Sequence, residues 1–208
     1  MEQQSNPKQL ATKPKFAIVY QGKIFEVIRW EGKPGVMFEA AVRAPGVRLI
    51  IETEKDGQKG LLMTKELRRE AEGFDYRLPG GKVFDNLEEY NQFRSKGGDI
   101  SAAAKLAAVK EGREEAGVLT GDISQVGISK AGASVEWDLH YYLVKNAKLG
   151  KQNLEEHEQG DIETIILSAH EIFEKLVAGK IQEGRSADVL WRWLAKNNFV
   201  EFVTDLRA

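Results

Sequence analysis

The alternation of short β-favouring runs with helical segments limits most strongly what this chain can fold into. Apolar runs at 46–52 and 60–64 flank Lys55-Asp56-Gly57, and an Asp-Gly pair between two such runs is a hairpin signal because glycine accepts positive φ. Helical spacing and strand-like runs then alternate, with helices predicted at 100–116, 169–178 and 187–197 and strands at 123–128, 137–144 and 164–167. Interleaved strands and helices favour a layered α/β fold over an all-α or all-β fold.

Three further β-favouring runs precede this hairpin, at 16–20, 23–30 and 36–42. Glycine-containing turns separate them, which predicts a small antiparallel sheet. The first fifteen residues are polar and have little to bury, so we expect a flexible lead there. The sequence therefore predicts three parts: a lead at 1–15, an N-terminal β subdomain at 16–45 and a main domain at 46–208.

Composition excludes several classes of function. The chain has 208 residues and a formal net charge of −2, which gives no electrostatic reason to expect nucleic acid or an anionic membrane as a partner. Cysteine is absent, so disulfides, thiolate metal sites and cysteine nucleophiles are excluded. No apolar run approaches the roughly 20 residues needed to span a bilayer, and the N-terminus lacks the apolar core of a secretion signal. We expect a soluble, cytoplasmic protein.

The most informative segment is the end of the predicted helix, with Ser101 as its expected N-cap. Glu111 and Glu115 are four residues apart, so their side chains project from one helix face about 6 Å apart along the axis. Mg²⁺ is usually held by one or two carboxylates together with substrate phosphate oxygens, and this spacing suits that geometry. Lys110 and Glu114 form a second pair of the same spacing. The alternative is a solvated charged face whose salt bridges contribute little.

Upstream of this helix, Arg77-Leu-Pro-Gly-Gly-Lys-Val83 forms a glycine turn that lets the backbone approach a ligand closely. Together with Ala107-Ala-Val-Lys-Glu-Gly-Arg-Glu-Glu-Ala-Gly-Val118, it resembles the Nudix hydrolase signature, G-x5-E-x7-R-E-U-x-E-E-x-G-U with U aliphatic. The tail of the signature matches position by position, at Glu111, Glu114, Glu115, Gly117 and Val118.

The chain also departs from this signature. Lys110 replaces the family arginine and Gly112 replaces an aliphatic residue, which costs a helix up to about 1 kcal/mol relative to alanine. Residues 84–98 are inserted before the helix, so the first glutamate of the signature has no clear counterpart, and Asp99 is the best candidate for its structural role. The insertion itself is either a substrate-capping loop or a plain surface excursion.

The similarity extends beyond the signature and is greatest to the ADP-ribose pyrophosphatase branch of the family. The similar segments are 39–47, 65–68, 155–162, 178–181 and 187–194. The resemblance implies a Nudix-like α/β/α sandwich with a mixed sheet and a small N-terminal antiparallel β subdomain, which in this branch commonly builds a homodimer. It also implies that metal-activated water attacks a diphosphate, giving AMP and ribose 5-phosphate from ADP-ribose, with Mg²⁺ or Mn²⁺ as cofactor.

The resemblance also assigns roles to individual residues. Glu111 and Glu115 would bind the metal, with the Gly80 carbonyl as a third ligand and Glu114 in support. In the acidic loop, Glu156 would take the proton of the attacking water, while Glu158 would reach the metal. The alternative for this loop is a merely solvated acidic turn.

Three residues are candidates for binding the nucleoside diphosphate substrate. Arg43 lies in the first similar segment, and Arg68 would clamp phosphate unless it belongs to a solvated face. Trp30 would stack on a base, although core burial explains it equally well. A sugar nucleotide is the second candidate substrate. Two other hypotheses remain. One is a non-catalytic nucleotide-binding module on a Nudix scaffold, and the other is an interaction protein whose helix is acidic by coincidence.

Overall fold

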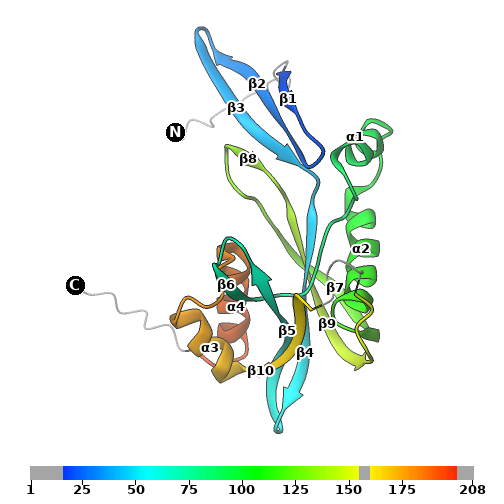
Figure 1. The fold of residues 1–208 in the computed structure, drawn as a ribbon, viewed down its shortest axis with the longest axis vertical. Coiled ribbons are helices and arrows are strands. Elements are labelled where there is room, and N and C mark those ends of the chain that lie inside the picture. The colour runs from blue at the N-terminus through cyan, green and yellow to red at the C-terminus, as the bar shows by residue number, and fades with distance from the viewer. Residues whose placement is uncertain (1–15, 155–159, 201–208) are drawn as a thin grey trace, which may run out of the picture.

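The computed structural model describes residues 16–154 and 160–200, which form two sheets and four helices (Figure 1). The core sheet contains β4 (Gly46–Lys55), β5 (Gln58–Arg68), β6 (Gly73–Arg77), β7 (Val118–Ser129), β9 (Leu139–Leu149) and β10 (Ile162–Ser168). The N-terminal sheet contains β1 (Phe16–Gln21), β2 (Phe25–Lys33), β3 (Val36–Arg43) and β8 (Val135–Glu136). The helices are α1 (Leu87–Ser95), α2 (Ile100–Glu114), α3 (Ala169–Val177) and α4 (Gly184–Lys196).

The core sheet is mixed, with the strand order β10-β5-β4-β9-β7 and with β6 paired to β5. β4 runs parallel to β9, while the other pairs of this sheet are antiparallel. The predicted hairpin joins β4 to β5 through Asp56 and Gly57, whose φ values are 53° and 73°. Two positive φ values in a two-residue loop are typical of a type I′ turn, which confirms the hairpin.

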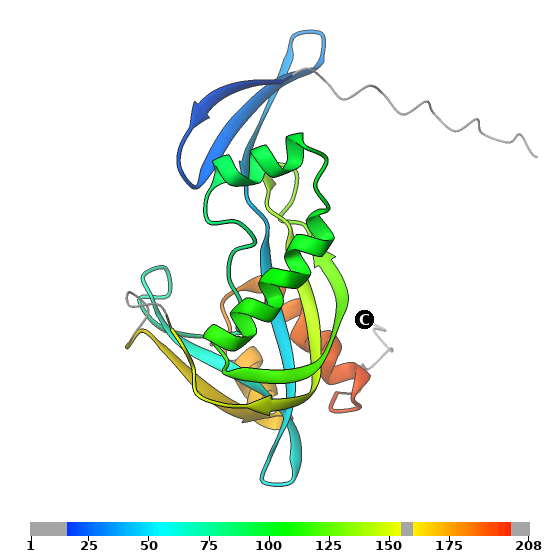
Figure 2. The ribbon, with the colours of Figure 1, turned by 90° about the vertical axis from the view of Figure 1, so that its right-hand side faces the viewer.

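Helices cover both faces of this sheet, because the side chains of its strands alternate between them. α2 packs on one face against Val47, Leu49 and Ile51 of β4, using small residues such as Ala104 and Ala108. α3 and α4 pack on the other face, which contains Ile50, Leu61, Met63, Tyr141, Ile172, Leu190, Trp193 and Leu194. Figures 1 and 2 show α2 on one side and the α3–α4 pair on the other. The α/β/α sandwich predicted from the sequence is confirmed.

The N-terminal sheet lies beyond one end of the sandwich (Figure 2). β1, β2 and β3 are antiparallel neighbours, as predicted, and β8 of the main domain adds a short parallel strand beside β3. β3 continues into β4 through Ala44 and Pro45, so one stretch of chain serves both sheets. The division at 15 and 45 stays a prediction, and the lead at 1–15 lies outside the described residues.

The inserted residues 84–98 contain α1, which the sequence pattern did not predict. Phe84 is buried, and its ring lies 5.1 Å from that of Phe93 between centroids. The Leu87 amide donates to the Lys23 carbonyl at 3.2 Å, and the Asn91 side chain donates to Glu26 of β2 at 3.3 Å. The insertion therefore joins the N-terminal sheet to the sandwich.

α2 begins at Ile100, as predicted, but its N-cap lies two residues before the predicted one. Asp99, and not Ser101, is the N-cap, because its carboxylate accepts hydrogen bonds from the amides of Ser101 and Ala102. The last helical residue is Glu114, with Glu115 as the C-cap. Within the described ranges, no helix is long and apolar enough to cross a membrane.

Candidate active site

The site is built around the glycine turn Pro79-Gly80-Gly81. β5 pairs with β4 only over Ile51–Lys55. Beside the first part of β4, the glycine turn takes the place of β5. The Leu49 amide donates to the Pro79 carbonyl at 2.8 Å, and the Val47 amide donates to the Gly81 carbonyl at 3.0 Å. Gly80 has a φ of 146°, and a Cβ there would overlap the Val47 carbonyl. Only glycine fits this close approach of two backbones.

The end of α2 brings two carboxylates to this turn. The Gly80 amide donates to Glu115 Oε2 at 2.7 Å. The Glu111 carboxylate lies directly against Gly81, where a methyl group would overlap it. The structure therefore brings both predicted acidic residues to the glycine turn, as their spacing on one helix face suggests.

Glu115 is a buried acid, with 5% of its surface exposed. The pKa of Glu115 is raised to about 8: burial is the main cause and the neighbouring acids Glu66 and Glu111 add to it, while the Gly80 hydrogen bond and the charge of Arg48 act in the opposite direction. A carboxylate in this position ionises at a free-energy cost unless a cation lies beside it. The arrangement therefore suits a bound cation.

The ligand set near the turn is small. Among the residues that the structure describes, no group of three or more histidine, aspartate or glutamate side chains is placed to hold a metal ion. Glu111, Glu115 and the Gly80 carbonyl remain, and this carbonyl also accepts a hydrogen bond from Arg48 Nη1 at 3.0 Å. Two carboxylates fit Mg²⁺ when substrate phosphates complete its shell. The predicted contributors Glu156 and Glu158 lie outside the described residues.

Lys110 and Glu114 form the predicted pair on the neighbouring face of α2, with 3.6 Å between Lys110 Nζ and Glu114 Oε2. Lys110 is mostly exposed, so solvent screens this pair and its contribution to stability is small. Asp99 caps the opposite end of α2, about 24 Å from Glu115 at 1.5 Å per residue. Asp99 is therefore a helix cap and lies outside the site. The supporting role of Glu114 stays a prediction.

A cavity of about 560 Å³ opens beside the turn and Glu115. Its lining is rich in basic residues: Lys23, Arg43, Arg48, Arg68, Arg77 and Lys82. The predicted Arg43 and Arg68 thus lie in one cavity with Glu115. Arg68 already donates to the buried Glu66, at 2.8 Å from its Nε.

Trp30 is placed elsewhere. Its ring stacks on Phe38 in the N-terminal sheet, at 5.7 Å between centroids. Trp30 lines a separate cavity of about 540 Å³ on that sheet, and it is not part of the described lining of the cavity at Glu115. Its role in substrate binding stays a prediction, without support from this geometry.

Sequence reasoning missed Arg48 and Glu183. Arg48 is buried, and its Nε donates to Glu183 Oε2 at 3.1 Å just before α4. The pair links the start of α4 to the glycine turn, since Arg48 also donates to the Gly80 carbonyl. An arginine inside the apolar run Val47–Ile51 is the sequence signal for a buried partner, although it does not identify Glu183.

Comparison with known proteins supports the fold. No known family profile matches the sequence, and no curated protein matches it significantly. Among solved structures, an ADP compounds hydrolase is similar, with a TM-score of 0.62 over 93% of this chain and 100% of that chain. The sequence identity is 16%, so the likeness shows a common fold and leaves the activity open.

Two glycine substitutions separate the site from the fold. Gly81→Ala should displace the Glu111 carboxylate, whose flexible side chain moves at little cost to folding. We expect an unfolding temperature close to that of the parent and Mn²⁺ binding weakened at least about tenfold. Mutation of residues that orient metal ligands typically lowers metal affinity by about 10–100-fold. Thermal unfolding and Mn²⁺ titration followed by electron paramagnetic resonance measure the two effects.

Gly112→Ala is the matched control on α2. A Cβ at Gly112 would lie 3.8 Å from its nearest neighbours, Leu49 and Val118, which is ordinary contact. This variant should gain up to about 1 kcal/mol in unfolding free energy and keep its Mn²⁺ affinity. If Gly81→Ala binds Mn²⁺ as tightly as Gly112→Ala does, Glu111 is not a ligand in the manner described.

Proposed function

We propose that this chain is a divalent-metal-dependent pyrophosphohydrolase of the Nudix type that cleaves the diphosphate of a nucleoside diphosphate derivative. The observation that carries the proposal is the convergence of Glu111 and Glu115 on the glycine turn, beside a cavity rich in basic residues. Carboxylates that hold a cation and arginines that bind phosphate are two of the elements that diphosphate hydrolysis uses.

In this proposal, separate residues bind the metal, orient its ligands and bind the diphosphate. Glu111 and Glu115 would hold Mg²⁺ or Mn²⁺, which when bound offsets phosphate charge and lowers the pKa of water. The Gly80 amide orients the Glu115 carboxylate through its hydrogen bond. Arg43 and its basic neighbours would orient the diphosphate. Glu114, restrained by Lys110, would support the ligands from the same helix.

ADP-ribose is the substrate that we propose first, with AMP and ribose 5-phosphate as products. The similarity of segments outside the signature to ADP-ribose pyrophosphatases supports it. The solved structure with a similar fold, an ADP compounds hydrolase, supports it as well. A cavity of about 560 Å³ is within the usual range for a small-molecule ligand. A sugar nucleotide is the second candidate.

A homodimer is part of the proposal. The N-terminal sheet exposes Ile18, Met37 and Phe38 among other large apolar side chains, and such a surface commonly marks an interface. The mass of the protein in solution tests this point, and a monomer contradicts it.

The main alternative is a nucleotide-binding module without turnover. Lys110 keeps the charge of the family arginine but loses its bidentate geometry, and the insertion at 84–98 changes the approach to the site. The pairing of Lys110 with Glu114 and the convergence of Glu111 and Glu115 on the glycine turn support a working enzyme instead.

A substrate panel tests the proposal. ADP-ribose, sugar nucleotides, dinucleotides and nucleoside triphosphates should be incubated with Mg²⁺ or Mn²⁺, with phosphatase coupling to reveal the products. We expect metal-dependent hydrolysis of a nucleoside diphosphate derivative, with ADP-ribose fastest. Chelation by EDTA should abolish it. Binding of these nucleotides without any turnover on the panel would favour the binding module instead.

The acidic loop is expected to supply the base, because the carboxylates of Glu111 and Glu115 would be occupied by metal. By resemblance we propose Glu156 for this role and Glu158 as a metal ligand. Single glutamine substitutions at Glu155, Glu156 and Glu158 should be compared by turnover at saturating substrate and metal. We expect the loss at Glu156 to be about 10²-fold or more, in the range of general-base contributions. Three variants within a few-fold of the parent would place the base elsewhere.

A further inference from the structure

Trp137, in the segment between β8 and β9, is held between two guanidinium groups. The Cζ atoms of Arg43 and Arg185 lie 4.0 and 4.2 Å from the centre of its ring. Two guanidinium groups cannot occupy the same place above one ring, so they cover its opposite faces. Arg185 Nη1 also donates to the Trp137 carbonyl at 2.8 Å. This stack fixes the plane of the indole and leaves only its edge available to a ligand.

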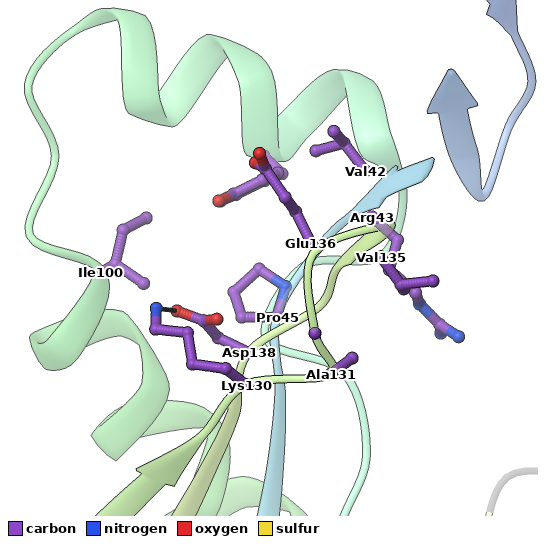
Figure 3. A pocket seen from close by; sticks show the side chains of 11 residues that line it. Val42, Arg43, Pro45, Ile100, Lys130, Ala131, Val135, Glu136 and Asp138 are labelled. Carbon is purple, nitrogen blue, oxygen red and sulfur yellow. Dashed lines mark hydrogen bonds and ion pairs between the residues drawn. The ribbon is translucent and has the colours of Figure 1, made fainter. Parts of the chain in front are cut away.

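Two buried donors of this stack have no hydrogen-bond partner among the described residues: Trp137 Nε1 and Arg43 Nε. Leaving a buried donor unpaired costs free energy, so native structures usually pair such groups. Both residues line the cavity that contains Glu115. Figure 3 shows that Arg43 also borders a smaller hollow, and that its side chain extends away from the Lys130–Asp138 ion pair there.

Gly46 lies close to both the edge of the Trp137 indole and the glycine turn. A Cβ built on Gly46 would lie 3.7 Å from Trp137 Nε1 and 3.1 Å from the Gly81 carbonyl oxygen. The indole donor and the turn that contacts Glu111 are therefore close enough to bind one small group between them. A side chain at position 46 would also overlap Leu139, so the glycine keeps the indole edge and the turn together.

The charge around the stack favours an anion. Burial lowers the pKa of Arg43, and the positive charges of Arg48 and Arg185 lower it further. One carboxylate serves several of these arginines, since Glu183 lies 3.1 Å from Arg48 and 3.9 Å from Arg185. Arg43, by contrast, has no carboxylate among the groups that shift its pKa, and guanidinium groups bind phosphate oxygens particularly well.

We propose that Trp137 Nε1 and Arg43 Nε bind a phosphate oxygen of the substrate beside the metal-binding carboxylates, with Arg185 as the positioning residue for the indole. The inference rests on the proposed function, because it assigns the phosphate-binding wall of the same cavity. It makes Trp137 a hydrogen-bond donor to the diphosphate. A base-stacking role is excluded, since both ring faces are covered by guanidinium groups.

Binding of inorganic pyrophosphate to the metal-free full chain, measured by calorimetry in EDTA, tests the inference. Trp137→Phe keeps a ring between the two guanidinium groups and removes only the N–H donor. We expect its pyrophosphate affinity to fall at least about tenfold, the effect of losing a hydrogen bond to a charged group. Arg43→Lys keeps the charge and removes the Nε donor, so it should also bind more weakly and serves as a second arm.

Trp193→Phe is the matched control. Trp193 lies on α4, and its indole N–H donates to the Glu52 carboxylate at 3.0 Å. Removal of this donor should lower the stability of the protein but leave its pyrophosphate affinity at the parent's value. A Trp137→Phe affinity within twofold of the Trp193→Phe affinity overturns the inference, and so does a parent that does not bind pyrophosphate.

The inference and the proposed function fail separately. If Trp137→Phe weakens pyrophosphate binding while the parent hydrolyses no substrate, the phosphate-binding wall stands and the proposed function is contradicted. If the parent is an active hydrolase while Trp137→Phe binds pyrophosphate normally, the enzyme assignment stands and the wall is overturned.

Discussion

The backbone pairing of the glycine turn with β4 is the constraint on which the site depends. Hydrogen bonds from Val47 and Leu49 fix the turn beside β4, and Gly80 permits the close contact with Val47. α2 packs on the same strand through small residues, and its last turn ends beside the glycine turn. The Gly80 amide then meets Glu115. A side chain at Gly80 would overlap the Val47 carbonyl of β4, and one at Gly81 would overlap the Glu111 carboxylate.

Buried charge explains why so much of the surrounding structure is polar. Glu115, Glu66 and Arg48 are all buried near the turn, and a buried charge is tolerated only with a partner. Arg48 is satisfied by Glu183 and by two carbonyls, and Glu66 by Thr64 and Arg68. The pKa of Glu115 is raised instead to about 8, which makes it the acid of this group that gains most from a bound cation.

Local periodicity predicted the elements that dominate the fold, and long-range pairing produced what it missed. The spacing of Glu111 and Glu115 is sufficient to place both on one face, and Asp56-Gly57 is sufficient to specify the first hairpin. The pairing of Arg48 with Glu183 spans 135 residues, and no local pattern contains it. α1 is short and largely polar, so apolar spacing gave no signal for it. The environment of Trp137 is also formed over a long range, because Arg43 belongs to β3 and Arg185 to α4.

The central claim is that Glu115 is a metal ligand required for turnover, and Glu115→Gln tests it most directly. With a pKa of about 8, the metal-free acid is largely protonated near neutral pH, so glutamine matches its size and charge and retains an acceptor for the Gly80 amide. Glu174→Gln, on the exposed face of α3, is the control. We predict parental thermal stability without metal in both variants, and a loss of metal-dependent turnover of at least about a hundredfold, or roughly 2.7 kcal/mol in barrier, only in Glu115→Gln. Equal turnover in the parent and Glu115→Gln would contradict the account.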